Sequence, residues 1–329
     1  MSAAGGGLGV PKTYKMYVGG AFVRSESGRT YPARSAGGDL LAHAVAGSRK
    51  DVRDAVRAAR GAQSPWAART AYNRGQILYR VAEVMDSRRA ELIGELARAT
   101  EGVEAAADPA TEVDVAIERW VWYAGWCDKY PQVLGGANPV SGPYFNFTVP
   151  EPMGVVGVVA PDEAPLAGIV SRLAPALVPG NAAVVLAGER YPLVAVTLAE
   201  ILATSDVPAG VVNILTGHRA PLVRALAGHG DVDCVDLSGC DPVAGEGGDG
   251  AGGSEGTGGS GADSGPGAAG AGTGSDDLAA EAERLAADTV TRVVHAAPGE
   301  RRWLEDSAQS PYAISAFCEY KTVWHPKGH

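Results

Sequence analysis

The stretch VVGVVAPDEAPLAGIVSRLAPALVPGNAAVVL, residues 155–186, holds two short apolar runs with a longer segment between them. Residues 155–160 and 182–186 are apolar apart from one glycine, which is typical of strands that are buried on both faces of a sheet. The intervening residues 166–177 have the length and spacing of a helix. A strand, a helix and a second strand in this order predict a parallel βαβ unit.

The same alternation continues toward the C-terminus. Helices are predicted over 193–204 and 220–227, and strands over 211–215 and 234–237. The rhythm predicts an α/β fold built on a Rossmann-like, doubly wound parallel sheet.

Helices also precede this stretch. Residues 14–24 predict a hairpin that turns at Gly19-Gly20. Ser48 can cap a helix that begins after it, and further helices are predicted over 71–100 and 111–130. Residues 144–149, YFNFTV, alternate between apolar and polar side chains, which predicts a half-exposed strand that could pair at its edge.

Residues 244–275 are almost wholly Gly, Ser, Ala, Asp and Glu. Such a segment cannot bury enough apolar surface to offset its ordering entropy, so a disordered linker is predicted there. Beyond it, residues 277–294 predict one amphipathic helix, and residues 317–324 predict a short strand. The positions expected to be buried in that helix are Leu278, Leu285, Val290 and Val293.

Composition narrows the classes of function. The 329 residues carry a net charge of −10 and no cluster of Lys or Arg, so no nucleic acid is expected as a partner. No apolar run approaches the length of a membrane span, and residues 1–10 lack the pattern of a signal peptide. Four cysteines without a CxxC pair and scattered histidines predict reduced thiols, no metal site and a cytoplasmic protein.

Six collinear segments resemble the aldehyde dehydrogenase family. One of them, EPMGVVGVVAP at 151–161, is similar to the family's EPxGVVGxIxPWN strand and turn. The others are WYAGWCDK at 122–129, PALVPGN at 175–181, the segment 189–193, VPAGVVNILTG at 207–217 and FCEYKTV at 317–323.

The resemblance implies a domain plan in which the family's catalytic domain is absent. The expected parts are a disordered N-terminus at 1–13, a cofactor-binding domain at 14–243, the linker at 244–275 and a C-terminal helix and strand at 276–329. The family's β oligomerisation flap would be formed by residues 138–152 and 317–324. The linker stands where the catalytic domain would be.

The resemblance also implies that no catalytic residue is present. The family's nucleophilic cysteine lies in a GQxC-type motif and its general base in an ELGG-type motif, and neither string occurs here. The EIFGP-type motif that holds the nicotinamide ribose does not occur either. Glu163 occupies the position of the asparagine that stabilises the oxyanion, and a carboxylate cannot donate the required hydrogen bond. As alternatives, Cys240 could be a nucleophile or Glu163 a general base. Cys240 has no His or Lys neighbour in sequence that would lower its pKa, and the ordinary interpretation of Glu163 is a solvated loop carboxylate.

For the cofactor, NAD or NADP, the resemblance implies a degenerate site. Its candidate residues are Ala160, Pro161, Glu189, Gly217, Gly239 and Cys240. Leu186 stands in place of the family's ribose-binding lysine, and Cys240 in place of a serine that meets the pyrophosphate. Arg219 follows the third strand and is expected to fill space that the adenine would use.

Two functions from different classes follow from the resemblance. The first is a catalytically inactive subunit that pairs through its flap with a full-length aldehyde dehydrogenase or associates with itself. The alternative is an NAD(P)-dependent oxidoreductase that acts on aldehydes only as part of a complex. Nucleotide sensing without turnover is a third possibility, which requires only the remaining Rossmann crevice.

Overall fold

The computed structural model describes residues 12–103, 106–240, 274–297, 299 and 301–327. The disordered segments predicted at 1–13 and 244–275 lie almost entirely outside these residues. At their inner ends, Thr13 belongs to strand β1 (Thr13–Tyr14), and helix α9 (Gly274–Asp288) begins at Gly274.

The centre of the molecule is a seven-stranded sheet with the order β12-β11-β8-β9-β10-β2-β3. Its parallel strands are β8 (Val155–Val159), β9 (Ala182–Leu186), β10 (Val212–Leu215), β11 (Cys234–Asp236) and β12 (Arg292–Val294). The hairpin of β2 (Met16–Val18) and β3 (Ala21–Val23) extends the sheet beyond β10. From β8 the chain moves outward through β9 and β10, and then returns to the other side for β11 and β12. The predicted doubly wound sheet is therefore confirmed.

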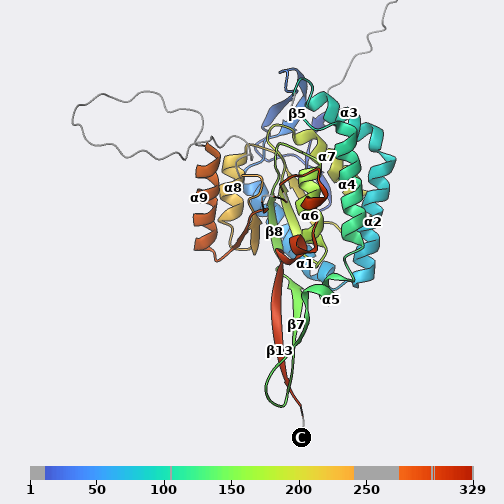
Figure 1. The fold of residues 1–329 in the computed structure, drawn as a ribbon. Coiled ribbons are helices and arrows are strands. Elements are labelled where there is room, and N and C mark those ends of the chain that lie inside the picture. The colour runs from blue at the N-terminus through green and yellow to red at the C-terminus, as the bar shows by residue number, and fades with distance from the viewer. Residues whose placement is uncertain (1–11, 104–105, 241–273, 298, 300, 328–329) are drawn as a thin grey trace, which may run out of the picture.

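Helices cover both faces of this sheet (Figure 1). On one face lie α2 (Ala71–Ser87), α4 (Pro109–Ala124), α6 (Ala167–Leu177) and α7 (Pro192–Ala203); on the other lie α1 (Arg49–Ala67), α8 (Arg219–Ala227) and α9. Val156 and Val158 pack into the core between the sheet and α2, α4, α6 and α7. Val155 and Val159 pack into the core between the sheet and α1, α8 and α9. Every side chain of β8 is thus buried, which is why its sequence is a continuous apolar run.

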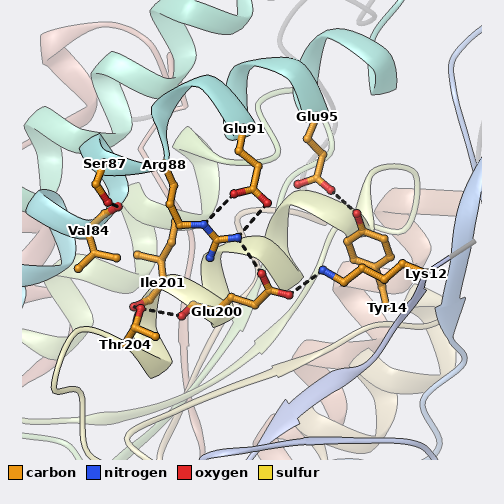
Figure 2. Close-up of polar contacts among 10 residues, drawn as sticks. All are labelled: Lys12, Tyr14, Val84, Ser87, Arg88, Glu91, Glu95, Glu200, Ile201 and Thr204. Carbon is orange, nitrogen blue, oxygen red and sulfur yellow. Dashed lines mark hydrogen bonds and ion pairs between the residues drawn. The ribbon is translucent and has the colours of Figure 1, made fainter.

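The helix predicted over 71–100 is two helices, α2 and α3 (Arg89–Ala99), which meet at Arg88. The backbone of Arg88 leaves helical geometry, with φ −106° and ψ 16°. Its guanidinium donates to Glu91 of α3 at 2.8 Å and to Glu200 of α7 at 2.7 Å (Figure 2). Apolar spacing could not locate this break, because both helices bury side chains in the same core.

The helix predicted over 277–294 is wrong in its second half. Helix α9 ends at Asp288, and Val290, which was expected to be buried, is 93% exposed with φ +58°. Residues 292–294 form β12, which pairs with β11 in parallel. A single-turn 3₁₀ helix, Asp306–Ala308, and α10 (Pro311–Ser315) follow.

Two other segments differ from the prediction. Helix α4 ends at Ala124, so the helix predicted over 111–130 is shorter, and α5 (Tyr130–Leu134) follows after a turn. Strands β4 (Thr30–Arg34) and β5 (Leu40–Val45), which were not predicted, form a separate sheet with β1. Among the helices that the structure describes, none is both long and apolar enough to cross a membrane.

A ribbon of three strands, the flap, projects from the body (Figure 1). Its strands are β6 (Gly136–Asn138), β7 (Tyr144–Pro152) and β13 (Cys318–Pro326), in the order β13-β7-β6. Strand β13 pairs with all nine residues of β7 in antiparallel register. The two segments predicted to form the flap therefore do lie together. Because side chains alternate along a strand, Phe145, Phe147, Val149 and the cross-strand Val323 share one face.

Candidate functional site

The carboxyl ends of β8 and β11 lie side by side where the strand order reverses. In doubly wound sheets, ligands bind in the crevice outside the carboxyl ends of the strands at this point. Ala160 follows β8 directly, and Gly239 follows shortly after β11. The candidate site is the place where this fold would hold a ligand, at the loops after β8, β9, β10 and β11, and we call it the switch-point crevice.

Arg219, the first residue of α8, places its guanidinium in this crevice. Its Nη1 donates to the carbonyl oxygen of Gly239 at 2.7 Å. Its Nη2 donates to the carbonyl oxygen of Ala160 at 2.9 Å and to Oδ2 of Asp162 at 2.8 Å. The Arg219 side chain is 19% exposed, and its Nε has no hydrogen-bond partner within the described residues. One guanidinium therefore bridges the loops after β8 and β11.

Glu189, in the loop after β9, fixes the start of α8. Its Oε2 accepts a hydrogen bond from the backbone nitrogen of Arg219 at 2.7 Å. Its Oε1 lies 2.9 Å from Nδ1 of His218. A carboxylate at a helix N-terminus is favourable because the first backbone N–H groups have no partner within the helix. Both oxygens of this predicted cofactor residue thus contact the protein itself.

Two of the predicted glycines lie where backbone segments approach closely. Gly217 has φ +150°, and a Cβ there would lie 2.9 Å from the backbone nitrogen of Gly47. A Cβ on Gly239 would lie 2.5 Å from the carbonyl group of Ala160. Glycine is needed at both positions to let the loops close around the strand ends.

The structure brings the predicted cofactor residues to one edge of the sheet. They follow four strands in turn: Ala160 and Pro161 after β8, Glu189 after β9, Gly217 after β10, and Gly239 and Cys240 after β11. Cys240 is 2% exposed, and its backbone nitrogen donates to the carbonyl oxygen of Leu237 at 2.7 Å.

Glu163, at the predicted oxyanion position, is not part of the switch-point crevice. Its exposed side chain lines a separate cavity of about 250 Å³, which Trp303 and Arg302 also line. The preceding Asp162 is paired with Arg219 in the crevice. The two adjacent carboxylates therefore belong to different sites.

Sequence reasoning missed Asp162 as the partner of Arg219, and it missed Tyr31 of β4. The rings of Tyr31 and His218 lie 5.5 Å apart, next to Glu189. Burial raises the pKa of the Tyr31 hydroxyl above its usual value, and the negative charge of Glu189 adds to the effect. These contacts join segments that are far apart in the chain, so no local pattern signals them.

Burial suppresses the reactivity of three of the four described cysteines. None of the four belongs to a disulfide, and all four are buried. Burial raises the pKa of Cys127 and of Cys318 to about 12, and it also raises the pKa of Cys234. The thiolate is the nucleophilic form, so these three thiols are not nucleophiles near neutral pH. Within the described part of the chain, no three His, Cys, Asp or Glu side chains are grouped so that they could hold a metal ion.

Residues 22–247 match the family model described as "Aldehyde dehydrogenase family". The putative aldehyde dehydrogenase DhaS of Bacillus subtilis (strain 168) is 36% identical over 230 residues, which are 69% of this chain and 46% of DhaS. The mitochondrial aldehyde dehydrogenase of Sus scrofa is 35% identical over 221 residues, which are 66% of this chain and 42% of that enzyme. This chain thus spans about half the length of these curated relatives.

Solved structures share the fold. The crystal structure of HpcC from Thermus thermophilus matches with a TM-score of 0.70 and 25% identity, over 88% of this chain and 49% of that one. The NAD+ complex of an aldehyde dehydrogenase from Bacillus cereus matches with a TM-score of 0.68 and 24% identity, over 86% of this chain and 50% of that one. The family model, the curated relatives and the fold agree, and the chain belongs to the aldehyde dehydrogenase family.

Proposed function

We propose that this chain is an aldehyde dehydrogenase-family subunit without an aldehyde-oxidising site of its own, which associates with a full-length aldehyde dehydrogenase through its flap. The observation that carries the proposal is the flap. It is a ribbon that projects from the body (Figure 1), in which β13 pairs with β7 along its whole length. Several of its apolar side chains are exposed.

The surface of the flap supports an association role. Phe145 is 47% exposed, Val149 36%, Tyr320 44% and Trp324 59%. Phe145 and Val149 lie on one face of the ribbon, and Tyr320 and Trp324, which pair with Pro150 and Asn146, lie on the other. Exposed apolar side chains on a face are typical of surfaces that a partner covers. Strand β13 is also the edge of its sheet, and a free edge can add a strand from another chain.

The choice of partner rests on what each candidate offers. The matched residues make up 46% of DhaS and 42% of the Sus scrofa enzyme, so a full-length member presents surface outside the region that this chain matches. A second copy of this chain offers no surface beyond this chain's own, and a symmetric contact through the flap has to be self-complementary. We therefore place the full-length relative first and self-association second.

The chemistry of the side chains supports the proposal that this chain has no aldehyde-oxidising site of its own. The sequence contains no GQxC-type or ELGG-type motif, and burial keeps three of the thiols protonated. Glu163 cannot donate a hydrogen bond to an oxyanion while it is ionised. A chain of this kind would influence aldehyde oxidation only through a partner.

The test is affinity purification of the tagged chain from its native cells, with the eluate identified by mass and assayed for aldehyde oxidation. We expect a stoichiometric full-length aldehyde dehydrogenase with the wild type. Phe145→Lys places a charge on the flap and should abolish the association. Leu40→Lys, at a 52% exposed position on β5, is the matched control and should retain it. Recovery of the wild-type chain alone would contradict the proposal.

The alternative is an NAD(P)-dependent oxidoreductase that acts on aldehydes within a complex. It is favoured by the fold, which is shared with a structure described as an NAD+ complex. A panel of aldehydes with NAD+ or NADP+, tested on the chain alone and with the co-purified partner, separates the two. Reduced cofactor formed by the chain alone, or activity of the complex that depends on this chain's crevice residues, would favour the alternative.

A further inference from the structure

We infer that Arg219 is an internal plug of the switch-point crevice, which excludes a dinucleotide from the place where this fold would hold one. The inference concerns the cofactor crevice and does not depend on association through the flap. It rests on the position of one guanidinium and on the groups that hold it.

The position is the first observation. The guanidinium contacts Ala160 after β8 and Gly239 after β11, the two loops between which the strand order reverses. A ligand at the switch point lies against these same loops. The carbonyl oxygens of Ala160 and Gly239 both accept hydrogen bonds from Arg219, so the guanidinium occupies the surface that these loops would offer to a ligand.

The plug is held at both ends. At the tip, the Asp162 carboxylate neutralises the guanidinium, and the other oxygen of Asp162 accepts from the backbone nitrogen of Arg190 at 3.2 Å. At the base, Glu189 accepts from the backbone nitrogen of Arg219. These contacts fix the side chain rather than leave it to swing in solvent.

An opposite role must be considered, because arginine also binds phosphate. In that role its N–H groups would point toward open space. Here Nη1 and Nη2 point to two carbonyl oxygens and one carboxylate of the protein, and the side chain is only 19% exposed. A pyrophosphate would have to displace Asp162 and would leave the two carbonyl oxygens without donors. The geometry therefore favours exclusion.

Removal of the plug should have the reverse effect. A smaller residue at position 219 vacates this surface and frees the carbonyl oxygens of Ala160 and Gly239, which ribose hydroxyl groups can satisfy. The two roles thus predict opposite changes in dinucleotide affinity when Arg219 is removed. If Arg219 bound phosphate, its removal would weaken dinucleotide binding; if it is a plug, its removal strengthens binding.

The experiment is isothermal titration calorimetry of the purified full chain with NAD+ and with NADP+. The variants are Arg219→Gly and the matched control Arg224→Ala, which removes an exposed arginine from the same helix. We expect a Kd for at least one dinucleotide that is about tenfold lower, or lower still, in Arg219→Gly than in the wild type. Arg224→Ala should behave as the wild type does.

A second variant guards against loss of the fold. Asp162→Asn keeps Arg219 but removes the carboxylate that neutralises it, and it should lower the Kd by a smaller factor. Circular dichroism establishes that each variant is folded. A dinucleotide-dependent rise in Tm detects binding without relying on the heat of binding that calorimetry measures. Equal or tighter binding by the wild type overturns the inference. So does a folded Arg219→Gly chain that binds neither dinucleotide.

Discussion

Replacement of Asp236 by alanine should destabilise the chain strongly, because it breaks a buried ion pair. Arg172 of α6 and Asp236 at the end of β11 have side chains that are 2% and 0% exposed, with Nε and Oδ2 2.5 Å apart. The variant removes the Asp236 carboxylate that lies against the buried guanidinium. Removal of one partner from a buried pair costs about 3–5 kcal/mol of unfolding free energy.

The surroundings place the expected loss at the upper end of that range. The second carboxylate oxygen of Asp236 accepts from the backbone nitrogen of Ser238 at 2.9 Å, and the Ser238 hydroxyl in turn accepts from the backbone nitrogen of Ala296. A buried donor that loses its acceptor adds a penalty of about 1–3 kcal/mol, although such terms are not additive. The ring of Phe317, 5.3 Å from the guanidinium, is there with and without Asp236, so it does not change this difference. We expect a loss of about 4–5 kcal/mol.

The assay is urea unfolding followed by far-ultraviolet circular dichroism and by tryptophan fluorescence. Glu281→Ala, which breaks an exposed pair with Arg224, is the matched control and should cost less than about 1 kcal/mol. The double variant Arg172→Met with Asp236→Leu should regain most of the loss, because an apolar pair can replace a buried ion pair. If Asp236→Ala costs no more than Glu281→Ala, the reasoning is refuted.

Two further predictions concern pH and thiol chemistry. Hydrogen bonds from Arg88 lower the pKa of Glu91; for Glu200 burial acts in the opposite direction, but bonds from Lys12 and Arg88 outweigh it and lower the pKa (Figure 2). Carboxylates with a lowered pKa stabilise the fold above their usual pKa and lose this effect as the pH falls through the folded value. Arg88→Ala should therefore lower the free energy of unfolding by roughly 1 kcal/mol at neutral pH and by much less near pH 3. Urea unfolding at both pH values measures this loss, and a loss that does not change with pH would contradict the prediction. Since all four thiols are buried, the native chain should react slowly with an aromatic disulfide at pH 8 and completely in urea; one rapidly reacting native thiol would argue against it.

The parallel strands β8 to β11 could be predicted because each is buried on both faces, which leaves an apolar residue at nearly every position. Strand β12 lacks this signal. It lies at the edge of the sheet and has three residues, of which Arg292 is exposed. Its two valines continue the apolar spacing of α9, so the spacing predicts that the helix includes them. Their strand conformation comes from pairing with β11, which a local pattern does not show.

For the candidate site too, part could be predicted from the sequence and part could not. Ala160, Glu189 and Gly239 could be placed together because the ends of parallel strands meet at one edge of the sheet. The pair of Asp162 and Arg219 could not, because it joins residues 57 positions apart through side chains whose directions depend on the folded loops. Resemblance to a family supplied the positions in the crevice, and only the structure supplied the contacts among them.

The pairing of β7 with β13 has a consequence for how the chain folds. Thr148 and Thr322, whose hydroxyl oxygens lie 3.0 Å apart, are separated by 174 residues. Contacts of such sequence separation form late, since a long loop must close before they contribute. Until β13 docks, β7 has only the three-residue β6 beside it, and an unpaired strand edge lies next to exposed Phe145. Resistance to aggregation during refolding is therefore governed by the rate at which β13 docks, which is a kinetic property that native stability does not report.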